Sequence, residues 1–297
     1  MRYYKTIYTG FLLLLQLFVF IGCSGGDDAT ANDTNSNPPQ NSMTSLLDVA
    51  YGEHPQEKYD VYLPANRNMA TTKTMVLIHG GGWTSGDKVD MNAFVTLLQQ
   101  NHPDLAIINV NYVLAGPDVP AFPNQREDIK NAFAHIKSKA SSYQIGTEFG
   151  ILGTSAGAHL GMLYGFDRAN SEEIKMIANI VGPVDFTDPA YLEAETKEIK
   201  DVLQALQGEA GIPETAFLEE FSPVSLVHSQ APPVVSFYGN IDPLIPNSQH
   251  ERLDAKLIAN QVQHQLTIYD GGHADWEPAS YFDLNEKLKN FITTFLE

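Results

Sequence analysis

The sequence of 297 residues is short of basic residues, with 18 Lys and Arg against 36 Asp and Glu and a formal net charge of -18. A surface this acidic repels phosphate backbones and anionic lipid headgroups, which argues against nucleic-acid binding. Cysteine is nearly absent, because Cys23 is the only one, and this excludes an internal disulfide and a Cys-based zinc site. Hydrophobic residues at 43% and charged residues at 18% are typical of a folded globular protein.

No apolar run is long enough to span a bilayer, which takes about 20 residues. Residues 11–21 form an apolar run of 11 residues after two basic residues, a pattern typical of an export signal. The run ends at Ile21-Gly22-Cys23, which resembles a bacterial lipobox. This resemblance predicts a lipoprotein signal peptide over residues 1–22 and a diacylglycerol on Cys23. The alternative is an ordinary secretory signal with a chance cysteine.

A polar segment follows the cysteine. Residues 24–45 contain no aromatic and no β-branched aliphatic side chain, so they cannot bury enough surface to offset the entropy cost of ordering. Residues 23–45 are therefore predicted to be a lipidated cysteine and a flexible tether. The acidic run at Asp27-Asp28 resembles the surface-export signal of Bacteroidetes lipoproteins. Together these features predict an exported protein, lipid-anchored to a bacterial outer membrane or cell surface.

The remaining residues, 46–297, contain no internal repeat and no second linker, which indicates one domain. One segment, residues 58–63, alternates polar and apolar side chains as a half-buried antiparallel strand does. Other strand candidates are continuous apolar runs, which indicate parallel strands covered on both faces. They are residues 75–78, 105–108, 149–152, 177–181 and 233–238, with another strand beginning near Gln265.

Helical periodicity lies between these runs. Residues 92–100 and 127–139 place apolar side chains at spacings of three and four, as amphipathic helices do. Alternation of strands and helices predicts an α/β fold with a mostly parallel, doubly wound sheet.

The first segment with chemical potential is Gly153-Thr154-Ser155-Ala156-Gly157, between a predicted strand and a predicted helix. The glycines make room for a sharp strand-to-helix turn that exposes the hydroxyl of Ser155 as a nucleophile. The helix N-terminus beneath it favours negative charge. A Gly-rich turn with a purely structural role is the alternative interpretation.

The second segment is His79-Gly80-Gly81-Gly82-Trp83, directly after a predicted strand. Successive glycines allow backbone N–H groups to turn toward an oxyanion, so we expect Gly81, Gly82 and Ala156 to supply its donors. Phosphate binding is disfavoured because the glycines form neither a G-K-[ST] nor a G-x-G-x-x-G motif. His79 is expected to orient this loop rather than to act as a base.

A serine nucleophile needs a general base and a carboxylate that orients it. Asp242 and His273 each follow a predicted strand late in the chain, in the Ser, acid, His order of α/β-hydrolases. Asp185 is the alternative acid, because it also follows an apolar strand. The other histidines are weaker candidates for the base: His159 should pack beneath the serine, and His102, His135 and His264 should be solvated.

The chain resembles the α/β-hydrolase esterases in five segments. They are His79-Gly-Gly-Gly-Trp83, Ser85-Gly-Asp-Lys88, the serine motif with Ala158-His159-Leu160, Asp242-Pro-Leu-Ile-Pro246 and Gly271-Gly-His273. They are most similar to the hormone-sensitive-lipase-like and bacterial acetyl- or feruloyl-esterase-like branch. The resemblance implies a serine ester hydrolase without metal or organic cofactor. By position it places the nucleophile on Ser155, the acid on Asp242, the base on His273 and the oxyanion donors on Gly81, Gly82 and Ala156.

One departure concerns Asn111-Tyr-Val-Leu-Ala-Gly-Pro117, which differs from the Tyr-Arg-Leu-Ala-Pro form common in hormone-sensitive-lipase-like members, so the substrate is left open. An insertion over residues 187–222 contains apolar side chains at helical spacing, and it is either a small cap over the pocket or an enlarged connection. Trp83 and Trp276 adjoin the predicted catalytic loops, where they either stack on a substrate or pack as anchors.

The expected substrates are short-chain or carbohydrate-linked acetyl or feruloyl esters. Two alternative functions are a serine peptidase with the same triad and a non-catalytic ligand-binding surface lipoprotein. The expected partners are the ester substrate and, through the lipid, a membrane.

Overall fold

A computed structural model describes residues 41–116, 119–194, 196–197, 200, 206 and 214–297. The predicted signal peptide, Cys23 and most of the predicted tether lie outside these residues. Within them, no helix has the length and apolar character needed to cross a membrane.

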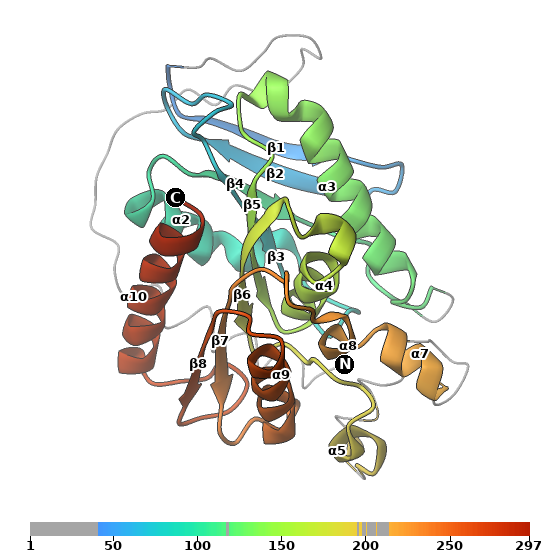
Figure 1. Cartoon of the computed structure of the whole chain (residues 1–297). Helices are drawn as coiled ribbons and strands as arrows, with labels where there is room; N and C mark the ends of the chain where they lie inside the picture. Colours follow the sequence, from blue (N-terminus) through green and yellow to red (C-terminus); the bar gives the residue numbers. More distant parts are fainter. Residues whose placement is uncertain (1–40, 117–118, 195, 198–199, 201–205, 207–213) are drawn as a thin grey trace.

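Eight strands form a single sheet in the order β1-β2-β4-β3-β5-β6-β7-β8 (Figure 1). Strands β1 and β2 run antiparallel to their neighbours, and all other pairs are parallel, as the continuous apolar runs predict. The strands are β1 (Thr44–Ala50), β2 (Lys58–Leu63), β3 (Thr74–Ile78), β4 (Ala106–Val110), β5 (Phe149–Thr154), β6 (Ile174–Ile180), β7 (Val234–Gly239) and β8 (His264–Tyr269).

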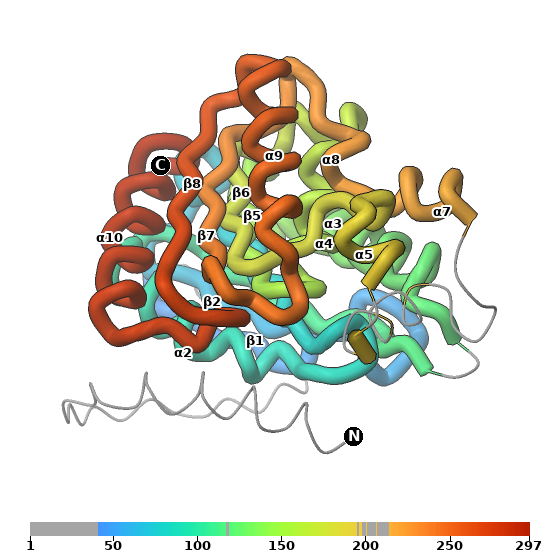
Figure 2. Tube along the Cα trace, turned by 90° about the horizontal axis from the view of Figure 1, so that it is seen from below, coloured from blue at the N-terminus to red at the C-terminus, as the bar shows by residue number. Residues whose placement is uncertain are grey.

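Helices cover both faces of the sheet. Figures 1 and 2 both show α2 and α10 on one side and α3, α4 and α9 on the other, which is the predicted doubly wound arrangement. The elements between and after the strands are η2 (Lys88–Met91), α2 (Asn92–Asn101), α3 (Asn124–Tyr143), α4 (Ala156–Gly165), η3 (Arg168–Asn170), α5 (Pro189–Leu192), α7 (Thr215–Glu220), α8 (Pro223–Leu226), α9 (Asn247–Ala259) and α10 (Pro278–Phe295).

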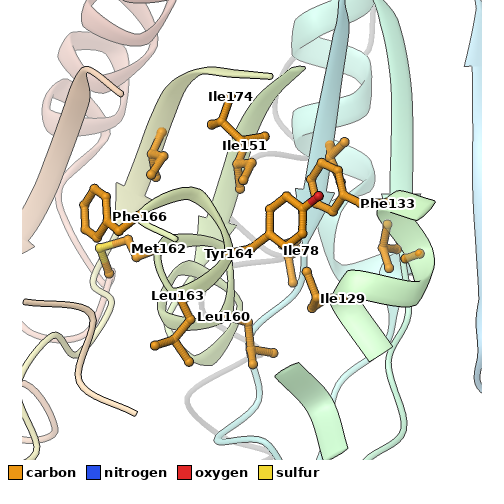
Figure 3. Close-up of a cluster of buried hydrophobic side chains, with 14 of the residues drawn as sticks. Ile78, Ile129, Phe133, Ile151, Leu160, Met162, Leu163, Tyr164, Phe166 and Ile174 are labelled. Atoms are coloured by element: carbon orange, nitrogen blue, oxygen red, sulfur yellow. The ribbon is translucent and has the colours of Figure 1, made fainter. Parts of the chain in front are cut away.

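The helix α4 is held firmly against the sheet, and this matters because it begins directly after Ser155. All ten of its residues are buried. Figure 3 shows its apolar side chains packed among those of β5, β6 and α3; the labelled residues include Leu160, Met162, Leu163, Tyr164, Ile151, Ile174, Ile129 and Phe133. Burial of each such side chain contributes about 1.5–3 kcal/mol, so the start of α4 is a rigid platform.

Strand β1 was not predicted. It begins at Thr44, two residues before the predicted start of the domain, and it lies at the edge of the sheet. Four of its seven residues are exposed, and Asp48 interrupts the pairing with a left-handed φ of 55°. An edge strand with this composition lacks the apolar pattern that reveals the buried strands.

The predicted insertion over residues 187–222 is described only in part. It contains α5, which Asp188 caps through its side chain, and α7. The described part is tied to the body, because the hydroxyl of Tyr191 donates to the carbonyl of Leu244 at 3.2 Å.

Candidate active site

Ser155 occupies the turn between β5 and α4 at the carboxyl edge of the sheet. Its φ of 51° and ψ of -119° are unusual for a residue with a side chain and cost about 1–3 kcal/mol. The turn is held in place because the N–H of Ser155 donates to the carbonyl of Ile180 in β6 at 2.8 Å. This is the strained turn that the serine motif predicts.

Gly157 lets the turn come close to the neighbouring strand. A Cβ atom at this position would lie 2.2 Å from the carbonyl oxygen of Ile78 and 2.3 Å from that of His79. Because both atoms belong to the backbone, a side chain could fit only if β3 and α4 moved apart. The glycine therefore sets the distance between the serine turn and the loop after β3.

The structure brings the three predicted triad side chains together. His273 Nε2 lies 2.9 Å from Ser155 Oγ, and His273 Nδ1 lies 2.7 Å from Asp242 Oδ2. Ser155 follows β5, Asp242 follows β7 and His273 follows β8. The geometry is that of a nucleophile, a base and an orienting acid in hydrogen-bond contact.

The carboxylate of Asp242 is fixed from both ends. Its Oδ1 accepts hydrogen bonds from the N–H of Leu244 at 2.8 Å and of Ile245 at 3.0 Å, which leaves Oδ2 facing His273. The Asp242 side chain has no solvent exposure and that of His273 is 11% exposed. A carboxylate held in this way stabilises a protonated imidazole and fixes its orientation.

The glycine loop after β3 faces the serine turn. Gly81 has a φ of 121° and Gly82 a φ of 56°, both in the region that side chains avoid. The carbonyl of Gly81 points away from the serine into its own loop, where it accepts from the N–H and hydroxyl of Ser85. In the described parts of the chain no group accepts a hydrogen bond from the N–H of Gly81 or Gly82.

His79 supports this loop from below. It is 1% exposed, its Nδ1–H donates to the carbonyl of Gly80 at 2.7 Å, and its ring stacks on Tyr112 with 4.4 Å between centroids. Burial lowers the pKa of His79, so the ring is neutral at pH 7. The Tyr112 hydroxyl donates to the carbonyl of His79 at 3.0 Å. His79 thus has the orienting contact that the sequence predicts.

Comparison with known families gives this geometry a context. The model of the BD-FAE family matches residues 59–257, about two thirds of the chain. The chain belongs to the BD-FAE family. The matched range contains Ser155 and Asp242, and the strand and loop with His273 follow it.

Curated relatives of this BD-FAE chain bear ester-hydrolase names. The probable carboxylic ester hydrolase LipM of Mycobacterium tuberculosis is 26% identical over 239 residues, covering 75% of this chain and 53% of that protein. The probable isoprenylcysteine alpha-carbonyl methylesterase ICMEL1 of Oryza sativa subsp. japonica is 25% identical over 252 residues, covering 75% and 55%. The chain spans about half the length of these relatives.

Solved structures with the same architecture confirm the predicted α/β-hydrolase fold. A truncated carbohydrate esterase from gut microbiota has a TM-score of 0.70 at 19% identity and covers 87% of this chain and 100% of its own. Esterase B from Lactobacillus rhamnosis (HN001) has a TM-score of 0.66 at 20% identity and covers 87% and 88%.

Asp185, the alternative acid, has other partners in the BD-FAE structure. Its Oδ1 accepts from the N–H and hydroxyl of Thr187, and its Oδ2 lies 2.9 Å from Arg252 Nη1. Both carboxylate oxygens of Asp185 therefore have partners, Thr187 and Arg252, whereas Asp242 contacts His273.

A buried ion pair holds the exit of the glycine loop, and sequence analysis did not assign it a role. Lys88 and Asp60 are 7% and 6% exposed in their side chains and lie 2.9 Å apart. Burial acts to lower the pKa of Lys88, but hydrogen bonds to Asp60 and Asp48 outweigh it and raise that pKa. Asn111 accepts from the N–H of Lys88 at 2.6 Å. The motif Ser85-Gly-Asp-Lys88 does not itself indicate this role, because the partners of Lys88 on β1, on β2 and just after β4 are distant in sequence.

Both tryptophans of the BD-FAE chain are packed anchors. Trp83 and Trp276 are each 2% exposed. Trp83 contacts the rings of Phe122, His159 and Phe186, and Trp276 donates from Nε1 to the carbonyl of Gly272 at 3.1 Å. The expectation that they stack on a substrate is therefore not supported by their exposure.

Two expectations for histidines have opposite outcomes. His159 packs beneath the serine as predicted: it is fully buried, its Nε2–H donates to the carbonyl of Phe221 at 2.8 Å, and burial lowers its pKa to about 3. His102 is buried rather than solvated, with Nδ1 2.8 Å from Glu297 Oε1. His135 and His264 are partly buried and contact Tyr59 and Asp254. These contacts join distant segments, which residue patterns do not reveal.

The described residues contain no group of three or more neighbouring His, Cys, Asp or Glu side chains that could hold a metal ion.

Proposed function

We propose that this BD-FAE protein is a serine carboxylic ester hydrolase that works through an acyl-enzyme. The observation that carries the proposal is the pair of contacts from His273 to Ser155 Oγ at 2.9 Å and to Asp242 Oδ2 at 2.7 Å. The N–H groups of Gly81 and Gly82, free of acceptors among the described residues, support it. The ester-hydrolase names of the relatives support it as well.

In the proposed reaction His273 Nε2 accepts the hydroxyl proton as Ser155 Oγ attacks the ester carbonyl. The oxyanion accepts hydrogen bonds from the N–H of Gly81, Gly82 and Ala156, each worth about 10²–10³ in turnover. His273 then donates its proton to the departing alcohol, which leaves an acyl group on Ser155. Water, deprotonated by the same imidazole, attacks the acyl carbonyl; the bond from that carbon to Ser155 Oγ breaks, the carboxylic acid is released, and His273 returns its proton to the serine oxygen.

We propose short-chain or carbohydrate-linked acetyl or feruloyl esters as the substrate class. The carbohydrate esterase among the structural neighbours supports this choice, as does the resemblance of the motifs to acetyl and feruloyl esterases. The same triad could serve a peptidase, and a hydrolase scaffold could serve ligand binding alone. An esterase breaks an ester bond, a peptidase breaks an amide bond, and a binding protein breaks neither.

A substrate comparison tests the proposal. The full-length protein should hydrolyse p-nitrophenyl acetate, and it should release acetate from acetylated xylan or ferulate from methyl ferulate. We expect rates on an aminoacyl p-nitroanilide to be at least about 10²-fold lower, because an amide carbonyl is less electrophilic than an ester and its amine must be protonated by a general acid before it leaves. Faster cleavage of the anilide would indicate a peptidase. No cleavage of any substrate would indicate a binding protein.

For the N-terminal region we propose export and lipid anchoring at Cys23 to a bacterial outer membrane or cell surface. The support is the apolar run of 11 residues that ends at Ile21-Gly22-Cys23. A metabolic label with a palmitate analogue in a bacterial host should appear on the full-length protein and be lost in Cys23→Ser. Equal labelling of both proteins, or of neither, would contradict the anchor.

A further inference from the structure

The loops that carry the acid and the base follow neighbouring strands and touch each other directly. Pairing of β7 with β8 ends at Gly239 and Tyr269. Beyond the strands, the N–H of Asn240 donates to the carbonyl of Tyr269 at 3.0 Å and that of Ile241 to the carbonyl of Gly271 at 3.1 Å. A Cβ on Gly239 would lie 2.2 Å from the carbonyl oxygen of Gly272, so the two backbones are in contact there.

The side chain of Asn240 adds two bonds across this junction. Its Oδ1 accepts from the N–H of Gly271 at 3.1 Å, and its Nδ2 donates to Asp270 Oδ1 at 3.0 Å. These partners fix the orientation of the amide, because an N–H only donates and a carboxylate only accepts. Asn240 lies two residues before the acid Asp242, and the bonded segment ends two residues before the base His273.

The bond to Gly271 reaches a glycine turn in the loop that carries the base. Gly271 has a φ of 138°, a conformation open mainly to glycine, and its carbonyl accepts from the N–H of Ile241 at 3.1 Å. On its far side the loop is fixed: the N–H of Gly272 donates to Asp275 Oδ1 at 2.6 Å, and Trp276 donates to the carbonyl of Gly272. The amide of Asn240 thus adds two side-chain bonds on the side of this turn that faces the acid loop, beside the backbone bonds already there.

We propose that Asn240 is a positioning residue that sets the distance between Asp242 and His273. The inference rests on the proposed function for its kinetic consequence. Asn240 itself is exposed, so packing does not require this residue. The asparagine side chain carries a donor and an acceptor on the same terminal carbon. The acceptor matches the N–H of Gly271 and the donor matches the carboxylate of Asp270. Small displacements of catalytic groups are costly, about 10²-fold for 1 Å.

Replacement of Asn240 and reciprocal exchange with Asp270 test the proposal. In the full-length protein, Asn240→Ala should lower kcat for p-nitrophenyl acetate about 10-fold and change KM less than about 2-fold, because orientation rather than binding is lost. Asn240→Asp should be at least as slow, since two carboxylates would face each other.

Asp270→Asn should keep kcat within about 2-fold of wild type, because an amide oxygen can accept the same bond. The double exchange Asn240→Asp with Asp270→Asn restores a donor and an acceptor and should return kcat to within about 3-fold of wild type.

A matched control and a second readout separate the possible failures. Asn260→Ala removes a side-chain amide that donates to the carbonyl of Lys256 at the end of α9, and it should leave kcat unchanged. The downfield proton resonance of the His273–Asp242 hydrogen bond should broaden or disappear in Asn240→Ala and return in the double exchange. Unchanged kcat and resonance in Asn240→Ala, or no recovery in the double exchange, would overturn the proposal. If the wild type hydrolyses no ester, the proposed function fails, while the resonance still decides the positioning role.

Discussion

Replacing Ser155 by alanine is expected to lower kcat/KM for p-nitrophenyl acetate by about 10⁴–10⁶-fold, the scale seen when a triad serine is removed. The hydroxyl of Ser155 is the group in contact with His273 Nε2, at 2.9 Å. Without it no acyl-enzyme forms, and only the oxyanion donors and substrate binding assist attack by water. Initial rates of the purified full-length proteins measure this change.

A control serine separates the chemistry from the general effect of the substitution. Ser138 lies exposed on α3, where its hydroxyl donates to the carbonyl of His135 at 2.7 Å. Ser138→Ala should therefore keep the wild-type rate. If Ser155→Ala also retained the wild-type rate, another residue would be the nucleophile, and the assignment of the site would be wrong.

Replacing Asp242 by asparagine is expected to lower kcat about 10⁴-fold with little change in the fold, as in other triads. The reason lies in the two N–H groups of Leu244 and Ile245 that donate to Oδ1. They would bind the amide oxygen of asparagine and turn its NH₂ group toward His273 Nδ1. That nitrogen would then have to accept a hydrogen bond, so the proton would move to Nε2, which could no longer deprotonate Ser155.

The same substitution at Asp185 decides between the two candidate acids. In Asp185→Asn the amide oxygen can still accept the bonds from Thr187, while the contact with Arg252 weakens. We expect some loss of stability and a change in kcat below about 10-fold. Measurement of kcat and thermal stability for both variants gives the answer, and a larger kcat loss in Asp185→Asn would reverse the assignment.

The centre of the sheet and the serine turn could be predicted from the sequence because both leave local patterns. Buried parallel strands are continuous apolar runs, and the sharp turn at Ser155 needs glycines at fixed offsets. The pattern at β1 is weak, because Thr44, Ser45 and Asp48 leave no continuous apolar run and four of the seven residues are exposed. The helix α3 extends from Asn124 to Tyr143, beyond the predicted 127–139: its first turn is polar, and Ala140 and Tyr143 continue the buried spacing past the predicted end.

The candidate site was predictable as a set of residue types and only partly as an arrangement. Asp185 and Asp242 both follow buried strands, and the local sequence does not say which one faces His273. That choice depends on Arg252, which lies on α9 and engages Asp185. The roles of Lys88 and Asn240 were missed for the same reason, because their partners lie 28 and about 30 residues away.

Covalent labelling by a fluorophosphonate, followed by peptide mapping with mass spectrometry, tests the central claim most directly. Such a reagent phosphonylates a serine only where a base activates the hydroxyl and donors stabilise the oxyanion. We expect one label per full-length protein, located on Ser155, and none on Ser155→Ala at the same reagent concentration and reaction time. A label on a different residue, or no label on a folded wild-type protein, would contradict it.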